Sequence, residues 1–569
     1  MKIINNSFPA RFLKFFLFFL FNFFPSFVFS QKPLEHPVFE AMSLELKRSM
    51  KQLKLENFFT PYFLSYQLLD STDTTINARN GAITFDQTQH ARYFYVELRY
   101  GNYEKDNTGE SYRGVFEGAA LEYNLESLRH ALWLMTDQAY KQAVKAYLEK
   151  QGKKISEVQK EDLPDFSKEK PHHTVVRMAE DDFPLESYKE ILKNISAEFK
   201  KYKEILDSGI TLRKVHRKNY LLNSEGTRLL HPGAGNSFQL YLWAKTMTED
   251  GMNLEVTRPF SFRSKEKGPS QEFLMKKAQE IVDQLLKLRV AKITDPYTAP
   301  ALLDGESTGV LFHEALGHRL EGERQRDEDE GQTFKGQIGK EIIPSFLSVE
   351  DDPTLMELEG EDLNGFYEFD DEGIRAQRVV LVEKGILKNY LLSRRPIKDF
   401  YHSNGHGRAQ FGRDPIGRMS NLIVKSSLTY PLDSLKNMLL EECRKQKKPY
   451  GFLIKRIRSG DTFTGRGRYQ AFRGTPEAVY LVDAQTGAET LVRGVEIVGT
   501  PLITVNRILA TSDFFQINNA FCGAESGLVP VSTIAPYSLV QEVELQRLPE
   551  EKSRPPILSP PFFSKGAEQ

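Results

Sequence analysis

Residues 313–323 read His-Glu-Ala-Leu-Gly-His-Arg-Leu-Glu-Gly-Glu, and the interpretation of the whole chain starts from this stretch. Apolar residues precede it, and either Ser307 or Thr308 can cap a helix that runs into it. Two histidines on one face of a helix, with a glutamate beside the first, are typical of a catalytic zinc site. In that pattern the histidines are four residues apart, whereas His313 and His318 are five apart.

The longer spacing matters because it changes where the two side chains point. Five residues of an ideal α-helix turn through ~500°, which leaves the side chains ~140° apart. Ligands that diverge this much cannot both lie ~2.0–2.1 Å from one ion. A π-bulge would bring the histidines together again, at least cost near Gly317. We therefore predict a bulge or kink between His313 and His318. The alternative is that the motif is not a metal site and that the histidines are hydrogen-bonded core residues.

The chain has two cysteines, and their surroundings differ. Cys443 follows apolar residues at helical spacing, which indicates a small core residue. Cys522 lies in the stretch 521–527, Phe-Cys-Gly-Ala-Glu-Ser-Gly, which favours a tight loop that can aim a side chain at a site. In an oxidising compartment the two cysteines can instead form a disulfide, and the sequence leaves this open.

The N-terminus has the pattern of a secretory signal peptide. Basic residues precede the apolar run 15–21, and the stretch 28–30, Val-Phe-Ser, offers a cleavage site. The run is well short of the ~20 apolar residues that a spanning helix needs, so we expect no stable membrane span. We predict that residues 1–30 are a signal peptide and that the protein is exported, to the periplasm or outside the cell. An uncleaved membrane anchor is the alternative.

Length and charge limit the classes of protein to consider. At 569 residues the chain is too long for one typical core, so we expect two domains. The formal net charge of -1 gives no support to nucleic-acid binding, which usually leaves a basic excess. A turn-rich stretch at 295–300 marks the expected boundary. The predicted organisation is a domain over 31–295, a second domain over 296–546 and a disordered tail over 547–569.

Helical and strand patterns alternate in the first half of the chain. Helical periodicity predicts helices at Val38–Leu55, Leu125–Glu149 and Glu272–Leu288. Alternating apolar residues predict strands at Phe63–Leu69 and Ala91–Arg99.

Strands dominate the second half, where hairpins are predicted at Val379–Leu392 and from Val479 onward. Two polar stretches, Lys150–Lys170 and Arg324–Gln332, are predicted to be an exposed insertion and a charged loop. The predicted fold class is α+β. It combines an N-terminal mixed α/β domain with a C-terminal strand-rich domain that carries the metal-site helix.

Together with motifs downstream, residues 313–323 resemble the TldD/PmbA family of metallopeptidases. They are similar to the family's His-Glu-x-x-x-His motif, which is followed by Leu-Glu-Gly and an acid. Further segments match in the same order: Gly336–Gly339, Asp370–Gly373, Gln377–Arg394, Gly417–Asn421, Cys522–Gly523 and Val529–Val531. The resemblance spans nearly all of residues 296–541, and several spaced motifs are more specific than one short match.

This resemblance implies a peptidase and assigns roles to four residues. His313, His318 and Cys522 would hold Zn²⁺, with a water molecule in the fourth position. Glu314 would be the general base that activates this water and passes its proton to the leaving amine. The implied activity is zinc-dependent hydrolysis of peptide bonds in small or unfolded peptides. No residues for another cofactor are predicted.

The resemblance leaves four further residues open. Glu321 and Glu323 can be partners of the histidines or surface acids at a helix end. Arg418 and Asn421 can contact substrate or be structural. The family's Cys-Gly is usually followed by Lys-x-Gly-Gln, whereas residues 524–527 are Ala-Glu-Ser-Gly. This difference puts a substrate contact from the basic residue in doubt.

Family members resemble one another in forming dimers that enclose the active site. The resemblance therefore implies a homodimer, or a heterodimer with a PmbA-like chain that lacks the His-Glu-x-x-x-His motif. Because the motif is intact here, the chain resembles the catalytic kind. The alternative function is a non-catalytic, peptide-binding partner subunit of such a complex. Hydrolysis of a non-peptide amide is also left open.

Overall fold

The computed structural model describes residues 36–109, 113–154, 163–176, 183–235, 237–326, 331–462, 472–548, 552–558 and 560–563. The predicted signal peptide, residues 1–30, lies outside the described residues, and the predicted tail is described only in part. From Pro37 onward the chain forms one compact unit, and the domain boundary at 295–296 stays a prediction. Within the described ranges, no helix is long and apolar enough to cross a membrane.

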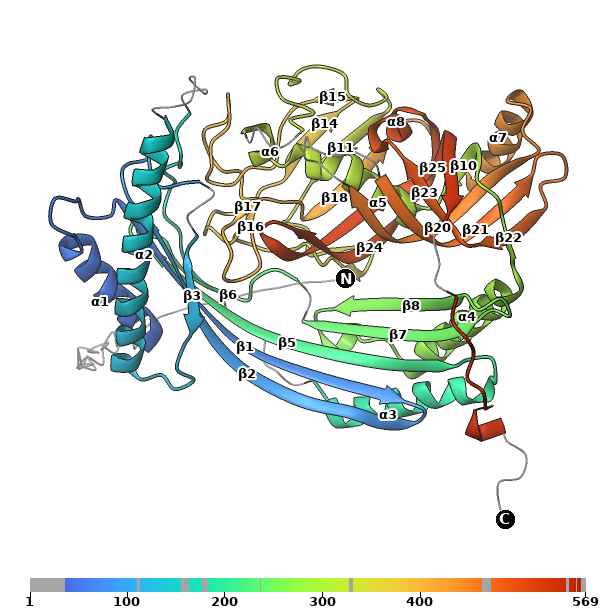
Figure 1. Ribbon diagram of the computed structural model, residues 1–569, viewed down its shortest axis with the longest axis horizontal. Coiled ribbons are helices and arrows are strands. Elements are labelled where there is room, and N and C mark those ends of the chain that lie inside the picture. The colour runs from blue at the N-terminus through green and yellow to red at the C-terminus, as the bar shows by residue number, and fades with distance from the viewer. Residues whose placement is uncertain are drawn as a thin grey trace, which may run out of the picture. The chain divides into compact units, whose positions relative to one another are not determined.

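The first half of the chain is built on a mostly antiparallel sheet with long central strands (Figure 1). Its described strands run in the order β3-β2-β1-β5-β6-β4, while β7 pairs with β5 and with β8. They are β1 (Phe63–Arg79), β2 (Ala82–Arg99), β3 (Val115–Gly118), β4 (His173–Val175), β5 (Asp207–Asn223), β6 (Arg228–His231), β7 (Phe238–Met247) and β8 (Asn253–Phe262). The helices are α1 (Pro37–Gln52), α2 (Leu125–Lys154), α3 (Leu185–Glu198) and α4 (Gln271–Val290).

The helices predicted for this half are confirmed, but β1 and β2 are longer than predicted. The apolar alternation stops near Leu69, yet β1 continues through the polar stretch Asp70–Asn77. This stretch pairs with β2 on one side and with β5 on the other. Hydrogen bonds on both sides hold the polar part extended, which a side-chain pattern does not reveal.

The second half is built on a mixed sheet. Its described strands run in the order β15-β14-β11-β18-β25-β10-β20-β21-β22-β9, while β23 pairs with β21 and β25, and β24 pairs with β19 and β25. The strands are β9 (Lys292–Ile293), β10 (Tyr297–Leu303), β11 (Leu347–Asp351), β14 (Val379–Glu383), β15 (Ile386–Leu387), β18 (Asn421–Ser426), β19 (Thr429–Tyr430), β20 (Tyr450–Thr462), β21 (Phe472–Asp483), β22 (Glu489–Arg493), β23 (Val495–Gly499), β24 (Ile508–Ala524) and β25 (Gly527–Arg547).

Short elements complete this half. They are the strand pairs β12 (Glu357–Leu358) with β13 (Glu361–Asp362) and β16 (Gly407–Arg408) with β17 (Ile416–Gly417), and the helices α5 (Gly305–Phe312), α6 (Glu323–Arg326), α7 (Leu432–Lys445) and α8 (Pro501–Asn506). The predicted hairpins are present as β14–β15 and β21–β22. The prediction of a mixed fold that is rich in strands is confirmed.

The cap of α5 differs from the prediction, since neither Ser307 nor Thr308 caps it. The Oδ1 atom of Asp304 accepts a hydrogen bond from the N–H of Ser307, 2.8 Å away, and is the N-cap. Its Oδ2 atom accepts another from the N–H of Arg456 on β20, 3.0 Å away. Asp304 therefore starts the helix and also fixes its beginning to the sheet.

The apolar side of α5 packs in the interior and so buries the histidine motif that follows it. Leu311, Phe312 and Leu316 are buried in one core with strands of the sheet, including Val531 of β25. The turn that follows α5 is therefore held by packing on the sheet rather than by solvent-exposed loop contacts.

The prediction of an exposed insertion at Lys150–Lys170 is wrong for residues 165–167, which are buried, whereas Lys168 and Lys170 are exposed. Asp165 and Phe166 are 4% and 2% exposed. The Oδ2 atom of Asp165 accepts hydrogen bonds from the N–H of Asp106 (2.9 Å) and from Nζ of Lys150 (2.6 Å). The charges that suggested exposure are therefore paired inside the protein.

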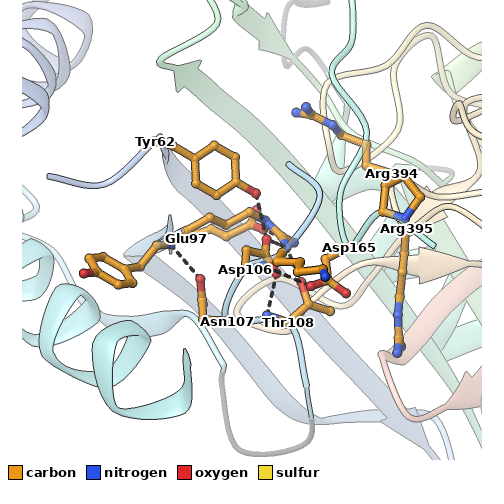
Figure 2. A network of polar contacts seen from close by, with 12 residues as sticks. Tyr62, Glu97, Asp106, Asn107, Thr108, Asp165, Arg394 and Arg395 are labelled. Atoms are coloured by element: carbon orange, nitrogen blue, oxygen red, sulfur yellow. Dashed lines mark hydrogen bonds and ion pairs between the residues drawn. The ribbon is translucent and has the colours of Figure 1, made fainter. Parts of the chain in front are cut away.

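Figure 2 shows the polar network to which Asp106 and Asp165 belong. The hydroxyl of Tyr62 and Nη1 of Arg99 both donate to Oδ2 of Asp106, over 2.7 and 3.0 Å. Nη2 of Arg326, at the end of α6, donates to Oδ1 of Asp165 over 2.9 Å. The network thus joins the loop after β2 to the segment that follows the histidine motif.

The predicted charged loop at Arg324–Gln332 is also wrong at its start, where α6 forms and Arg324 is buried. Residues 327–330 of that stretch lie outside the described residues.

Candidate metal centre

The helix that carries the two histidines changes its winding between them. After α5 ends at Phe312, residues His313–Gly317 form a turn of π-helix. The N–H of His318 donates to the carbonyl oxygen of His313, five residues back rather than four. The predicted bulge is confirmed. The centroids of the two imidazole rings lie 4.9 Å apart, with the ring planes at 90°.

Two neighbouring residues support this turn. Nη1 of Arg319 donates to the carbonyl oxygens of Glu314 (2.5 Å) and Ala315 (3.3 Å). Gly317 has an ordinary helical φ of -51°, so the turn does not need glycine for its backbone freedom. A Cβ atom at this position would overlap the Sδ atom of Met419. The glycine is required because Met419 approaches so closely, which differs from the reason the sequence suggested.

Cys522 reaches the histidines from the other end of the sequence. It lies on β24 opposite Val529 of β25, so the prediction of a loop at this position is wrong. Its Sγ atom lies 3.1 Å from Nε2 of His313 and 3.4 Å from Nε2 of His318. The structure therefore brings together the three side chains that were predicted as metal ligands. Strand pairing, rather than a loop, holds the sulfur in place.

The three side chains fit the donor set of zinc. One possible ligand atom from each residue lies within 4.8 Å of the others. A tetrahedral zinc ion holds neighbouring nitrogen and sulfur ligands about 3.4–3.6 Å apart. The observed nitrogen-to-sulfur distances of 3.1 and 3.4 Å are close to this range. Two imidazoles and one thiolate leave one tetrahedral position for water or substrate.

The electrostatics of the cluster favour the thiolate form of the cysteine. Burial raises the pKa of Cys522, but His318 and His313 outweigh burial and hold this pKa well below its usual value. Burial lowers the pKa of His318, but Cys522 and Glu321 outweigh it and raise this pKa well above its usual value. The pKa of His313 is raised chiefly by Cys522, again against burial. Because the thiolate is the form that binds metal, the cluster keeps the sulfur ready as a ligand.

Glu321 holds the second ring nitrogen of His318. Its Oε1 atom lies 3.0 Å from Nδ1 of His318, and its Oε2 atom accepts a hydrogen bond from Nε of Arg324 over 2.7 Å. Burial raises the pKa of Glu321, but His318, Arg324 and Arg418 outweigh burial and lower it to about 2. Glu321 is therefore an ionised, fully buried partner of a histidine and not a surface acid.

Glu323 has a different role. It is buried as well, but its Oε2 atom accepts a hydrogen bond from the N–H of Gly417 over 2.8 Å and its Oε1 atom accepts one from Ser393. It anchors these two segments, and its hydrogen bonds within the described part of the chain go to them rather than to a histidine. The suggested pairing of Glu323 with a histidine is therefore not what the structure shows.

Arg418 and Asn421 are both fully buried and make structural contacts. Nη2 of Arg418 donates to the carbonyl oxygen of Cys522 (2.9 Å) and lies 3.2 Å from its Sγ atom. Nη1 of Arg418 donates to Oγ of Ser526 in the turn after β24. Nδ2 of Asn421 donates to the carbonyl oxygen of Asp352 over 2.9 Å. Arg418 therefore fixes both the backbone and the sulfur of Cys522.

His313, Glu314, His318 and Cys522 line one cavity of about 1030 Å³. Its walls come from β7 and β8 of the first half and from α5, β20 and β24 of the second half. Gly460 on β20 borders Glu314 closely, because a Cβ atom at this glycine would stand 2.9 Å from Cγ of Glu314. The cavity therefore places a carboxylate and three side chains that could bind a metal in one space.

Part of the chain is similar in sequence to known proteins. A metalloprotease of Archaeoglobus fulgidus is 34% identical over 261 residues, which are 46% of this chain and 56% of the relative. A zinc metalloprotease TldD homolog of Saccharolobus solfataricus is 28% identical over 254 residues, which are 43% of this chain and 51% of the relative. Residues 296–547 match the family model described as the PmbA/TldA metallopeptidase C-terminal domain. Over residues 296–547 the chain is thus similar to the TldD/PmbA family.

The chain spans about half the length of these two curated relatives. A crystal structure of TldE from Thermococcus kodakarensis extends the similarity, with a TM-score of 0.58 over 89% of this chain and 100% of that chain at 14% identity. At this identity the likeness shows the fold alone, and it covers the first half of the chain as well. The relatives' names identify metalloproteases at the level of the family.

The two cysteines of the chain are separate. Both are free and buried. Cys443 lies on α7 and packs with Leu435 and Leu439, as the helical spacing predicted. Burial raises the pKa of its thiol to about 11. The two cysteines therefore form no disulfide with each other in the structure.

Three residues of the site were missed in the sequence. Arg319 follows His318 directly in the sequence, so its place beside the histidine motif could have been noticed. Its hydrogen bonds to the carbonyl oxygens of Glu314 and Ala315 form only because the turn is distorted. Arg324 was assigned to a loop, and Gly460 gave no signal because its neighbour Glu314 is far away in the chain. Such contacts become visible only when the strands are in place.

Proposed function

We propose that this protein is a zinc-dependent peptidase in which His313, His318 and Cys522 hold the metal. The observation that supports this most is the convergence of these side chains in a cavity that Glu314 also lines. A buried site with two imidazoles, one thiolate and an adjacent carboxylate suits hydrolysis better than a purely structural role, since a structural zinc is usually closed by four protein ligands.

When bound, zinc supplies a Lewis acid that polarises the scissile carbonyl and lowers the pKa of water to ~7. Glu314 takes a proton from the attacking water and later delivers it to the nitrogen of the leaving amine. Gly460 leaves the room that the Glu314 side chain occupies. Glu321 orients the ring of His318 through Nδ1, and Arg418 positions Cys522. These residues hold the metal ligands and the base in fixed positions relative to one another.

The proposed substrates are small or unfolded peptides. Beyond Ser512, the described part of β24 pairs with β25 alone, so one backbone edge of β24 is unpaired where residues 518–524 line the cavity. An extended peptide can add to such an edge by backbone hydrogen bonds, which tolerate many sequences. In a folded protein most strands are already paired and only edge strands could add in this way.

A non-catalytic partner subunit that only binds peptides is the second candidate function. It requires no base beside the metal ligands, whereas Glu314 is present and lines the cavity. The choice between the two functions therefore depends on what Glu314 does.

Export and assembly belong to the same proposal. The N-terminal pattern supports export to the periplasm or outside the cell, and the resemblance to dimeric family members supports a homodimer or a pair with a PmbA-like chain. Mass spectrometry of the mature N-terminus tests export, and the molar mass in solution, with and without such a chain, tests assembly.

The decisive experiment measures bound zinc and peptide cleavage in the same preparations. Glu314→Gln is expected to keep zinc and lose cleavage, because it preserves the shape of the side chain but removes the base. Cys522→Ala is expected to lose much of the zinc. Cys443→Ala is the matched control, because it removes the other buried cysteine and should change neither quantity. Full cleavage by Glu314→Gln would reject the mechanism.

A further inference from the structure

A second hollow of about 630 Å³ lies beside the cavity that contains the proposed metal site. The two spaces share lining residues where β8 and β24 lie side by side (Figure 1). Pro259 and Ser261 contribute from β8, and Asn518 and Asn519 contribute from β24. A chain that leaves the metal cavity along β24 therefore enters the second hollow.

Aromatic and aliphatic side chains line one part of this hollow, beside charged and amide side chains. Phe260 on β8 and Phe273 in the first turn of α4 lie edge to face, with ring centroids 5.6 Å apart. Ile517 of β24 lines the same space. Phe273 is 41% exposed, so part of its ring is open to solvent. The hollow thus presents apolar surface that an incoming side chain can cover.

Two lysines that line the hollow already have acidic partners. Nζ of Lys267 lies 2.7 Å from Asp362, and Nζ of Lys277 lies 2.8 Å from Glu280. An acidic ligand would have to displace these pairs, whereas an apolar side chain would leave them intact and remove water from Phe273. The chemistry of the hollow therefore favours an apolar occupant.

The geometry of β24 gives the distance of this hollow from the metal site. Cys522 and Ile517 are five positions apart on one strand. A strand rises ~3.4 Å per residue, so the two positions are separated by about 17 Å. A substrate strand beside β24 has the same rise. A side chain in the hollow therefore belongs to a residue four or five positions from the bond at the metal site.

We propose that this hollow is a remote specificity subsite, which binds a large apolar, preferably aromatic, side chain four or five residues from the cleaved bond. The proposal rests on the proposed peptidase function and adds a substrate class to it. The substrates are extended peptides with an aromatic residue at that distance, and peptides too short to reach the hollow bind more weakly.

The test uses the zinc-loaded full chain and alanine-rich peptides in which one phenylalanine is moved along the sequence on either side of the cleaved bond. Phenylalanine at the fourth or fifth position is expected to raise kcat/KM about tenfold, mainly through KM. Phe273→Ala should remove this gain and leave cleavage of the all-alanine peptide unchanged, and Phe273→Leu should restore part of it. Phe85→Ala is the matched control, because Phe85 is 42% exposed and lies on β2, away from both spaces.

The subsite and the peptidase activity fail in different ways. If no position of phenylalanine gives a gain, or if Phe273→Ala weakens all peptides equally, the subsite is rejected while cleavage still supports the enzyme. If the wild-type chain cleaves nothing, binding of fluorescent peptides to zinc-loaded Glu314→Gln still decides the subsite by anisotropy. Equal affinity for the phenylalanine and alanine peptides would then overturn it.

Discussion

The Nδ1 atom of His318 lies 3.0 Å from Oε1 of Glu321, while the Nε2 atom of the same ring faces the sulfur of Cys522 at 3.4 Å. One ring nitrogen is thus oriented by a buried carboxylate and the other is directed at the proposed metal position. Such a partner fixes the tautomer of a ligand and raises its basicity.

Replacing this partner should weaken the metal site without removing a ligand. Glu321→Gln is expected to weaken zinc binding about 10–100-fold, because the neutral amide orients the ring less firmly and leaves Arg324 without its ionised partner. Competition with a fluorescent zinc chelator measures the change. Glu525→Gln is the control, since Glu525 also pairs with Arg324 but is half-exposed and touches neither histidine. Equal zinc affinity of both variants would contradict the role of Glu321.

Gly460→Ala should disturb the base and spare the metal. The added Cβ would stand 2.9 Å from Cγ of Glu314 and 2.9 Å from Val310, so the carboxylate must move. A displacement of about 1 Å can cost 10²-fold in rate, and we expect a fall of kcat of about this size with unchanged zinc content. Gly118→Ala is the control, because nothing lies within 4 Å of a Cβ at that position. Unchanged kcat in Gly460→Ala would show that Glu314 needs no fixed position.

Gly317→Ala tests the close approach that shapes the bulge. Its Cβ would overlap Sδ of Met419, so the turn that carries His318 must shift. We expect a lower thermal midpoint and weaker zinc binding, with a stability loss of about 1–3 kcal/mol from overpacking. The double variant Gly317→Ala with Met419→Ala should recover zinc binding, since the obstacle is gone. Failure to recover would mean that the glycine serves the turn in another way.

The buried network in Figure 2 should make the free energy of unfolding depend on pH in the acidic range. Burial raises the pKa of Asp106, but Arg99 and the hydroxyls of Thr108 and Tyr62 outweigh it and lower this pKa. An acid with a lowered folded pKa stabilises the protein above its unfolded pKa of ~3.9 and loses that contribution as the pH falls through the folded pKa.

Asp106→Asn should therefore destabilise the protein by about 3 kcal/mol near neutral pH, and its stability should fall less steeply below about pH 4. Urea midpoints at several pH values measure both effects. Asp137→Asn removes an exposed pair with Lys141 and should change neither. The same acid response in Asp106→Asn and the wild type would contradict the assignment.

Metal removal should distinguish the two cysteines. Stripping zinc with a chelator is expected to make Cys522 react with an alkylating reagent near pH 8, because its pKa is lowered and it lines the cavity. Cys443 should react slowly with or without metal, because burial raises its pKa to about 11. Peptide mapping by mass spectrometry follows each thiol. Protection of Cys522 that does not depend on zinc would argue against its role as a ligand.

The sequence by itself determined the features that depend on near neighbours. The five-residue spacing of His313 and His318 was sufficient to predict a bulge, because helix geometry fixes the direction of each side chain. Periodicity likewise located α1, α2 and α4 of the first half, though not α3, and the burial of Cys443. The spaced motifs were sufficient to recognise the family.

Only the tertiary structure decided what meets across the chain. Whether Cys522 reaches His313 depends on the pairing of β24 with β25 and on the packing of α5 against the sheet. The same is true of the separate roles of Glu321 and Glu323, and of Asp165, whose buried partners turned an apparently exposed stretch into part of the interior. Local periodicity reports which side of an element is apolar, but a charged residue is buried or exposed according to partners that only the folded path of the chain supplies.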